Sequence, residues 1–363
     1  MTHPSPTGQP VTGGQERTRF ADELRDALDL RAVLLILGVL ALQLGFVLSY
    51  IGAFHAPTPH RIPVAVVAPA PVADQLVQRL DALDGEPLRA RTADSEDRAR
   101  ALILDRTVDA AIVVDTGGTT DTLLVASASG PAVSSTAAQI AQQVETAQNR
   151  QVTVEDILPP AAGDGRGLSS FYLALGWIVG GYLAAAIIGL AGGALPVNLH
   201  RTLIRLGALA LYAVASGLGG ALIAGPVLDA LPGHHLRLWT IGALVVFAAA
   251  AATLAFQVLL GMVGIGVTIL AFVVLGNPSA GGAYPTPLLP TFWRAIGPWL
   301  PPGAATTAIR NTVYFSGHAT AGPLWTLSAY ALGGIALAVV ATLARRRRAP
   351  QLRHGRHEVR QHP

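Results

Sequence analysis

Apolar and polar residues follow two different patterns along this chain, and the longer pattern predicts most of the architecture. Six apolar runs are each long enough to cross a bilayer, which takes about 20 helical residues. They are residues 32–54, 169–194, 206–228, 238–256, 258–276 and 324–344. The fourth and fifth runs are hard to separate, because only Gln257 marks a turn between them. The pattern predicts a membrane α-helical protein with six transmembrane helices, the first of them an uncleaved anchor.

The shorter pattern occupies residues 55–168, between the first two runs, where the composition is that of a globular domain. Short β-rich runs alternate here with amphipathic stretches. We expect strands at 62–69, 87–93, 109–115 and 122–128, and helices at 72–83, 95–106 and 134–150. This order predicts a small α/β domain inserted between the first and second spans.

Arginine is distributed unevenly about the six runs. One side carries Arg201, Arg205 and the arginines near both chain ends, whereas the short loops on the other side hold only Arg237, Arg294 and Arg310. Positively charged loops stay in the cytoplasm. We therefore expect a multi-pass protein of the plasma membrane with both termini cytoplasmic and the α/β domain outside.

The two tails differ from the spans that they flank. Residues 1–19 are rich in Pro, Gly and Thr and are predicted to be disordered. Residues 20–31 have helical spacing of apolar positions, which fits either an amphipathic helix at the cytoplasmic interface or an extension of the first span. The basic tail at 345–363 is explained by topology and anionic lipid, so no nucleic acid is needed as a partner.

The composition of the chain excludes several kinds of functional site. The chain has 363 residues, 51% hydrophobic and 13% charged, with no Cys and no Lys. The absence of Lys excludes a phosphate-binding loop of the GxxxxGK[ST] type. His234 and His235 are adjacent but lack a third ligand nearby, and no Ser/His/Asp arrangement is evident. We expect no enzyme activity, no metal and no cofactor.

Charges are scarce in the predicted spans. Past residue 164 the only acidic residues are Asp229, at the end of a span, and Glu358, in the tail. Ion-coupled transporters need ionisable groups inside the membrane, so a self-powered transporter is disfavoured, and a channel is disfavoured because no span has a polar stripe. Small residues recur at four-residue spacing, in Gly176/Gly180, Gly189/Gly193 and Gly217/Ala221/Gly225. They fit packing inside the bundle or, less simply, across a dimer.

Residues 277–323, before the last span, are too rich in Gly and Pro to form one helix. Irregular backbone at a membrane must be covered by protein or line a cavity, so we expect a turn and short interfacial or re-entrant helices on the outer side. No acidic residue in 276–322 balances Arg294 and Arg310, which could contact an anionic headgroup or simply anchor in lipid. The candidate gate and substrate residues are Asn277, Arg294, Trp299, Arg310 and Asn311.

One span, a large exterior domain, five further spans and an outer segment before the last one resemble the permeases of type-2 ABC exporters. The stretches "GLSSFYLALGWIVGGYL", "LGNPSAGGAYP" and "LPPGAATTAIRNTVYF" look more specifically like actinobacterial, phage-infection-protein-like members of that superfamily.

The resemblance implies an export permease that works as a homo- or heterodimer with a separate cytoplasmic ATPase and moves an amphipathic or lipid-linked molecule outward. It also implies that residues 277–323 form the outer gate and that residues 20–31 and 196–205 contact the ATPase. Arg201 and Arg205 are then contact candidates, although anchoring on the cytoplasmic side explains them equally well. The alternative is a non-transporting envelope protein whose exterior domain binds a partner or phage.

Overall fold

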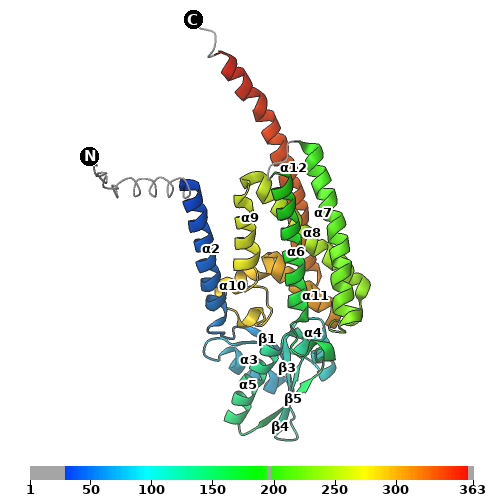
Figure 1. Ribbon diagram of the computed structural model, residues 1–363. Helices are drawn as coiled ribbons and strands as arrows, with labels where there is room; N and C mark the ends of the chain where they lie inside the picture. The colour runs from blue at the N-terminus through cyan, green and yellow to red at the C-terminus, as the bar shows by residue number, and fades with distance from the viewer. Residues whose placement is uncertain (1–28, 194–197, 359–363) are drawn as a thin grey trace, which may run out of the picture. The chain divides into compact units, whose positions relative to one another are not determined.

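The computed structural model describes residues 29–193 and 198–358, and within them five helices are long and apolar enough to cross a membrane (Figure 1). They are α2 (Leu30–Phe54), α6 (Ser169–Gly192), α7 (Leu199–Leu222), α8 (His235–Leu260) and α12 (Ala321–Glu358). The chain is thus a multi-pass membrane protein with a mixed α/β domain. The interface helix predicted at 20–31 lies, up to residue 28, outside the described residues.

The prediction of six full-length spans is wrong at the fifth run. Residues 263–275 form the α-helix α9 (Val263–Thr268) and the π-helix η4 (Ile269–Leu275), a short apolar helix overall. At 1.5 Å per residue it reaches roughly 20 Å, against about 30 Å for a bilayer core. The first residues of the predicted run belong to α8, which continues past Gln257 and ends at Gly261, where φ is +65°. Hydropathy alone cannot place a helix boundary inside an uninterrupted apolar run.

The chain divides into two compact units, residues 1–47 and 48–363. The described part of the first unit is the beginning of α2, whose apolar side chains are almost all exposed. Such a surface suits contact with lipid. Within the second unit, the end of α2 contacts the remaining chain: Ser49 Oγ donates to the Val274 carbonyl, and the rings of Phe54 and Tyr284 lie 5.8 Å apart.

The transmembrane bundle of the second unit is built around α8. Residues Ala248 to Ala252 of this helix are all buried. Three neighbouring helices approach it through glycines: a Cβ on Gly181 of α6 would lie 2.5 Å from the Val246 carbonyl oxygen, and Gly217 of α7 and Gly334 of α12 face its backbone equally closely. Small residues on both sides let the helices come into backbone contact.

The small-residue pattern of the sequence is therefore explained in part by packing inside the bundle. Gly189 faces the side chain of Gln257, and Gly217 faces Ala243 on α8. Gly176 has open space at the position of a Cβ. Packing within the bundle, the simpler of the two interpretations, is confirmed for Gly189 and Gly217.

The α/β domain contains a five-stranded sheet in the order β2-β1-β3-β4-β5. Its strands are β1 (Ile62–Val67), β2 (Leu88–Thr92), β3 (Ala110–Val113), β4 (Thr120–Val125) and β5 (Gln151–Asp156), and its helices are α3 (Ala70–Asp81), α4 (Glu96–Leu104) and α5 (Pro131–Ala147). β3 and β4 are antiparallel, and the other neighbours are parallel. The predicted order of elements is confirmed, but β5 was missed because this edge strand is polar and mostly exposed.

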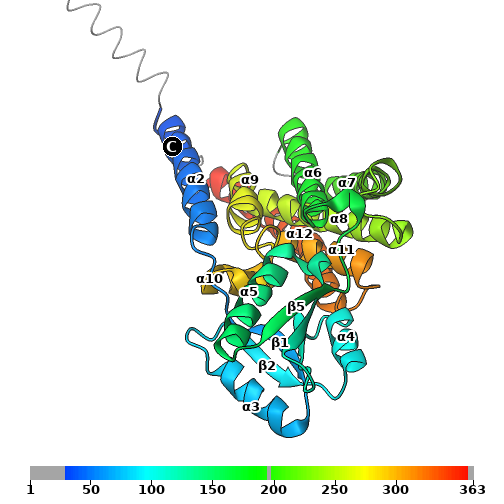
Figure 2. The ribbon, with the colours of Figure 1, turned by 90° about the horizontal axis from the view of Figure 1, so that it is seen from below.

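The two faces of the sheet are covered by different helices (Figure 2). Ile62, Val64 and Val66 of β1 pack with α3 and α5 on one face, whereas Ala65 packs with α4 on the other. β1 is buried on both sides, which explains its continuous apolar sequence. The strand is thus the centre of the domain.

A matched pair of substitutions on α7 tests the packing against α8. Gly217→Ala puts a methyl group 2.5 Å from the Ala243 amide nitrogen, so we expect a loss of about 1–3 kcal/mol in the free energy of unfolding. Gly219→Ala meets nothing within 4 Å and should be neutral or stabilising. Thermal unfolding of the two purified variants measures the difference, and equal stability would contradict the close contact.

Candidate functional site

Residues 277–323, which we call the junction segment, connect the bundle to the α/β domain. They contain a turn, the 3₁₀ turns η5 (Thr286–Leu288) and η6 (Gly297–Trp299), and the short helices α10 (Thr291–Ile296) and α11 (Pro301–Tyr314). α11 is buried over most of its length and contacts α6, α8 and α12. The expectation that irregular backbone is covered by protein agrees with this arrangement.

Glycines fold the junction segment tightly onto itself. A Cβ on Gly297 would clash with the Ser279 carbonyl, and one on Gly303 would clash with the Gly297 carbonyl. Gly276 faces Pro302 in the same way. The turn, the 3₁₀ turn η6 and the start of α11 therefore stack in backbone contact, which no larger residue would allow.

Arg310 is the most unusual side chain of the junction segment, because it is a buried guanidinium with 5% exposure. One of its terminal nitrogens, Nη1, donates to the Gly281 carbonyl at 3.1 Å, whereas Nε and Nη2 have no hydrogen-bond partner in the described part of the chain. The negative charges of Asp164 and Asp109 stabilise the charged guanidinium, and the positive charge of Arg106 destabilises it. Burial raises the pKa of Asp109, and the charges of Arg106 and Arg310 oppose that rise.

The two candidate asparagines are also buried, each with one amide oxygen unpartnered among the described residues. Asn311, next to Arg310 on α11, donates from Nδ2 to the Ala319 carbonyl at 3.3 Å. Asn277 begins the turn that ends at Gly281, the partner of Arg310, and hydrogen-bonds to Tyr50. Asn277, Arg310 and Asn311 are thus three buried polar side chains of the junction segment.

Arg294 and Trp299 are more exposed than these three residues. Arg294 is half-buried on α10 and donates to Thr291 Oγ1 at 3.4 Å, and Trp299 is 73% exposed. An exposed Trp with an Arg nearby is typical of a membrane interface. The five candidates therefore divide into a buried group of three and a surface pair.

Asp164 joins α11 to α6 and to the α/β domain. Its carboxylate accepts from the Tyr314 hydroxyl at 2.7 Å and from the Ser169 amide, at the start of α6, at 2.9 Å. The Ala161 amide in turn donates to the Tyr314 hydroxyl at 3.4 Å. A single buried carboxylate thus fixes the end of α11 and the beginning of α6 together.

Side chains of the junction segment also complete the hydrophobic cores of the α/β domain. Leu288 is buried with β1 and α3, and Phe315 is buried with Ala65 and α4. The Arg106 guanidinium lies 4.6 Å from the centre of the Phe315 ring, a cation–π contact. The junction segment is therefore part of the α/β domain as well as of the bundle.

At the opposite end of the bundle, the two ATPase-contact candidates differ in their exposure to solvent. Arg201 is exposed in the first turn of α7. Arg205 is buried, and its Nη2 donates to the Gly192 carbonyl at the end of α6 at 2.7 Å. This hydrogen bond satisfies a free helix-terminal carbonyl. Of the two, only Arg201 presents its charge at the surface.

A second polar cluster, in the α/β domain, was not singled out from the sequence. Arg150 Nε donates to Asp121 Oδ2 at 2.7 Å and lies 3.8 Å from Glu145 Oε2. Burial and the neighbouring Asp121 carboxylate raise the pKa of Glu145 to about 7. Burial alone would also raise the pKa of Asp121, but hydrogen bonds from Arg150 and the Asp115 amide hold it below its ordinary value.

Most of these partners could not be found from the sequence. Asp164 and Tyr314 are 150 positions apart, and Asp121 and Arg150 are 29 apart. Nothing in the local pattern links them. The one signal in the sequence is that Asp164 stands five residues before Ser169, at the start of the second span, where a carboxylate commonly caps a helix.

Comparison of the chain with protein-family models, with curated proteins and with solved structures gave no match. Function must therefore be inferred from the sequence patterns and from the contacts described above.

The stability of the α/β domain should depend on pH through Glu145. Its ordinary pKa is 4.5, and the folded state retains the proton up to about pH 7. The contribution is present in full below pH ~4.5 and is lost as pH rises to about 7, a change of about 3 kcal/mol in the free energy of unfolding. Glu145→Gln should remove this dependence. Hydrogen exchange of β4 and α5 peptides at several pH values, corrected for intrinsic exchange, measures it.

Asp97→Asn is the control for that measurement, because Asp97 is exposed on α4, on the other face of the sheet. It should keep the pH dependence of the unaltered protein. An unchanged pH dependence in Glu145→Gln would show that Glu145 does not carry the proton.

Proposed function

We propose that this protein is the permease subunit of an exporter that is driven by a separate cytoplasmic ATPase and moves an amphipathic or lipid-linked molecule outward. The observation that carries the proposal is the buried guanidinium of Arg310 on α11, a short helix that contacts α6, α8 and α12. Burying a charge with unpartnered nitrogens costs several kcal/mol. A bundle that served only as an anchor would gain nothing from this buried charge. A gate would gain an ion pair with the anionic headgroup of its substrate.

The need for a separate ATPase is supported by what the chain lacks. It has no Lys, and hence no phosphate-binding loop of the GxxxxGK[ST] type. Within the apolar parts of the five described spans, which for α12 is Ala321–Arg345, no Asp or Glu occurs, and the arginines lie near their ends. The resemblance to type-2 ABC exporter permeases supports the same division of labour, with two permease chains per exporter and both termini in the cytoplasm.

One observation favours the alternative, a non-transporting envelope protein. The glycine contacts of α6, α7 and α12 with α8 make a closely packed bundle, as expected for a rigid anchor. In that case the α/β domain would carry the function by binding a partner or phage, and Arg310 would be a structural residue.

The ATPase partnership is tested by purifying the tagged full-length chain from its native membrane and measuring ATP hydrolysis in the purified material. We expect an ATPase to co-purify and its activity to rise with native lipid. Arg201→Glu should reduce its recovery about tenfold, as expected for loss of a charged interface contact. Arg205→Glu is not suitable, because it would break the hydrogen bond that closes α6.

Arg91→Glu is the matched control, since Arg91 is exposed on β2 in the α/β domain, predicted to lie on the other side of the membrane. Its ATPase recovery should equal that of the unaltered chain. Absence of any co-purifying ATPase, with Arg201→Glu and Arg91→Glu behaving alike, would leave the anchor function as the better account.

Arg310→Met separates a gate residue from a structural one. Methionine fills similar volume and removes the cost of a buried charge, but it also removes a cation that favours the Asp109 and Asp164 carboxylates, so the free energy of unfolding should change little. The lipid-stimulated part of ATP hydrolysis should nevertheless fall to the basal level. Arg89→Met, at an exposed position of β2, should leave both quantities unchanged. Retention of full stimulation by Arg310→Met would refute the gate role.

A further inference from the structure

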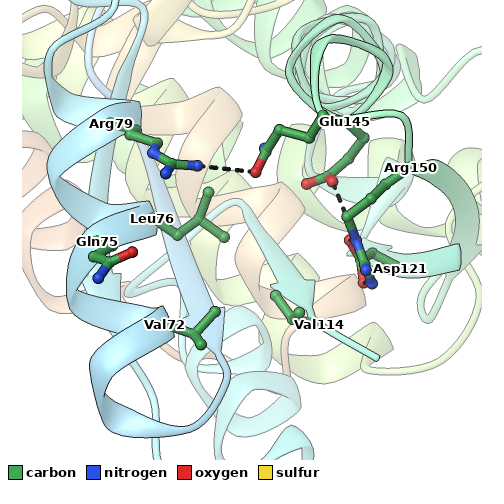
Figure 3. A pocket seen from close by; sticks show the side chains of 9 residues that line it. Val72, Gln75, Leu76, Arg79, Val114, Asp121, Glu145 and Arg150 are labelled. Atoms are coloured by element: carbon green, nitrogen blue, oxygen red, sulfur yellow. Dashed lines mark hydrogen bonds and ion pairs between the residues drawn. The ribbon is translucent and has the colours of Figure 1, made fainter. Parts of the chain in front are cut away.

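A pocket of about 130 Å³ opens between α3 and α5 in the α/β domain (Figure 3). One side of it is apolar, formed by Val72 and Leu76 of α3 and by Val114 after β3. The polar side chains that line it include Arg79 from α3 and Glu145 from α5. The pocket thus combines an apolar wall with charged groups, as small-molecule sites commonly do.

The pocket lies on the face of the sheet that α3 and α5 cover, at the end of the sheet where β3 ends and β4 begins. Val114 directly follows β3, and Asp121 lies at the start of the antiparallel strand β4, at the same end.

Arg79 and Glu145 are the two groups of the pocket with which a ligand could form ion pairs. Asp121 is bound by both Arg150 and the Asp115 amide, and Arg150 donates further to two backbone carbonyls. Arg79 Nη1 donates to a neutral amide oxygen, that of Gln148, at 2.9 Å. Glu145 is 2% exposed, lies 3.8 Å from the Arg150 guanidinium, and forms a hydrogen bond with Asp121 through the proton that it retains. Arg79 thus has no carboxylate partner among the described residues, and Glu145 holds a proton that the cation of a ligand can replace.

We propose that this pocket binds a small free amino acid, with the carboxylate paired to Arg79, the ammonium paired to Glu145, and the side chain against Val72, Leu76 and Val114. The volume suits the ligand, because a cavity of about 150 Å³ holds one benzene ring, or roughly six heavy atoms. Alanine has that size. The proposal is independent of the export function, since it concerns the α/β domain alone.

Binding of the ammonium replaces a proton on Glu145. The groups that face this carboxyl are Asp121 from β4 and Arg150 before β5, with Arg79 across the pocket on α3, and Asp115 acts on the charge of Arg150. Because Glu145 retains its proton up to about neutral pH, the ligand ammonium takes its place and the proton leaves to solvent. The affinity should therefore rise from about pH 6 to about pH 8.

The test is calorimetric titration of the full-length chain in lipid nanodiscs, without any ATPase, with alanine and β-alanine as probes. Propionate and ethylamine, which carry only one of the two charged groups, serve as comparison ligands. We expect at least one of the two amino acids to bind about tenfold more tightly than either comparison ligand, as loss of one charge-assisted contact predicts.

Two variants assign the contacts. Glu145→Gln and Arg79→Gln should each weaken amino-acid binding about tenfold, and Glu145→Gln should also abolish its pH dependence. Asp97→Asn and Arg98→Gln change the same charges at exposed positions of α4, on the other face of the sheet, and should bind as the unaltered protein does.

No binding of either amino acid at millimolar concentration would overturn the proposal. So would equally tight binding of propionate or ethylamine, or unchanged affinity in both pocket variants. Because no ATPase is present in the titration, these outcomes do not bear on the export function.

Discussion

Close approach of helix backbones to α8 is the constraint on which the rest of the second unit depends. Without water inside a bilayer, helices are held together by van der Waals contact and by occasional hydrogen bonds. Glycines on α6, α7 and α12 and alanines on α8 supply that contact. Trp177 of α6 fills the remaining space against Gly220 and Gly242, and its indole nitrogen donates to the Ser216 carbonyl at 3.1 Å. The short helix α11 then packs against α6, α8 and α12 of this bundle.

Charge is placed according to the same constraint. Three arginines near the ends of the apolar spans donate to free carbonyls at or just beyond the C-terminal ends of other helices: Arg205 to Gly192, Arg345 to Leu259 and Arg237 to Ser316. Each satisfies an acceptor that would otherwise lack a partner and places a cation at the negative end of a helix dipole. Arg310 departs from this arrangement, since its acceptor, the Gly281 carbonyl, does not lie at the end of a helix, and two of its nitrogens, against one of Arg205, have no partner among the described residues. That departure is why a functional role, rather than a structural one, is proposed for it.

The junction segment couples the bundle and the α/β domain. Leu288 and Phe315 are core residues of the domain, while α11 is packed among the membrane helices. Asp164 adds a hydrogen-bonded connection between α11 and the start of α6. A displacement of the domain relative to α11 would therefore break these contacts.

The sequence by itself determined the membrane class, the α/β domain and most of its elements, because hydrophobic periodicity records which surfaces are buried. It also indicated that residues 277–323 could not be one helix, since Gly and Pro act locally. Tertiary structure decided the rest. The boundary at Gly261, the edge strand β5, the burial of Arg205 and Arg310 and the pairing of Asp121 with Glu145 all depend on contacts between residues distant in the chain. Local patterns cannot record such contacts, because what a side chain meets across a fold is set by packing rather than by its neighbours in sequence.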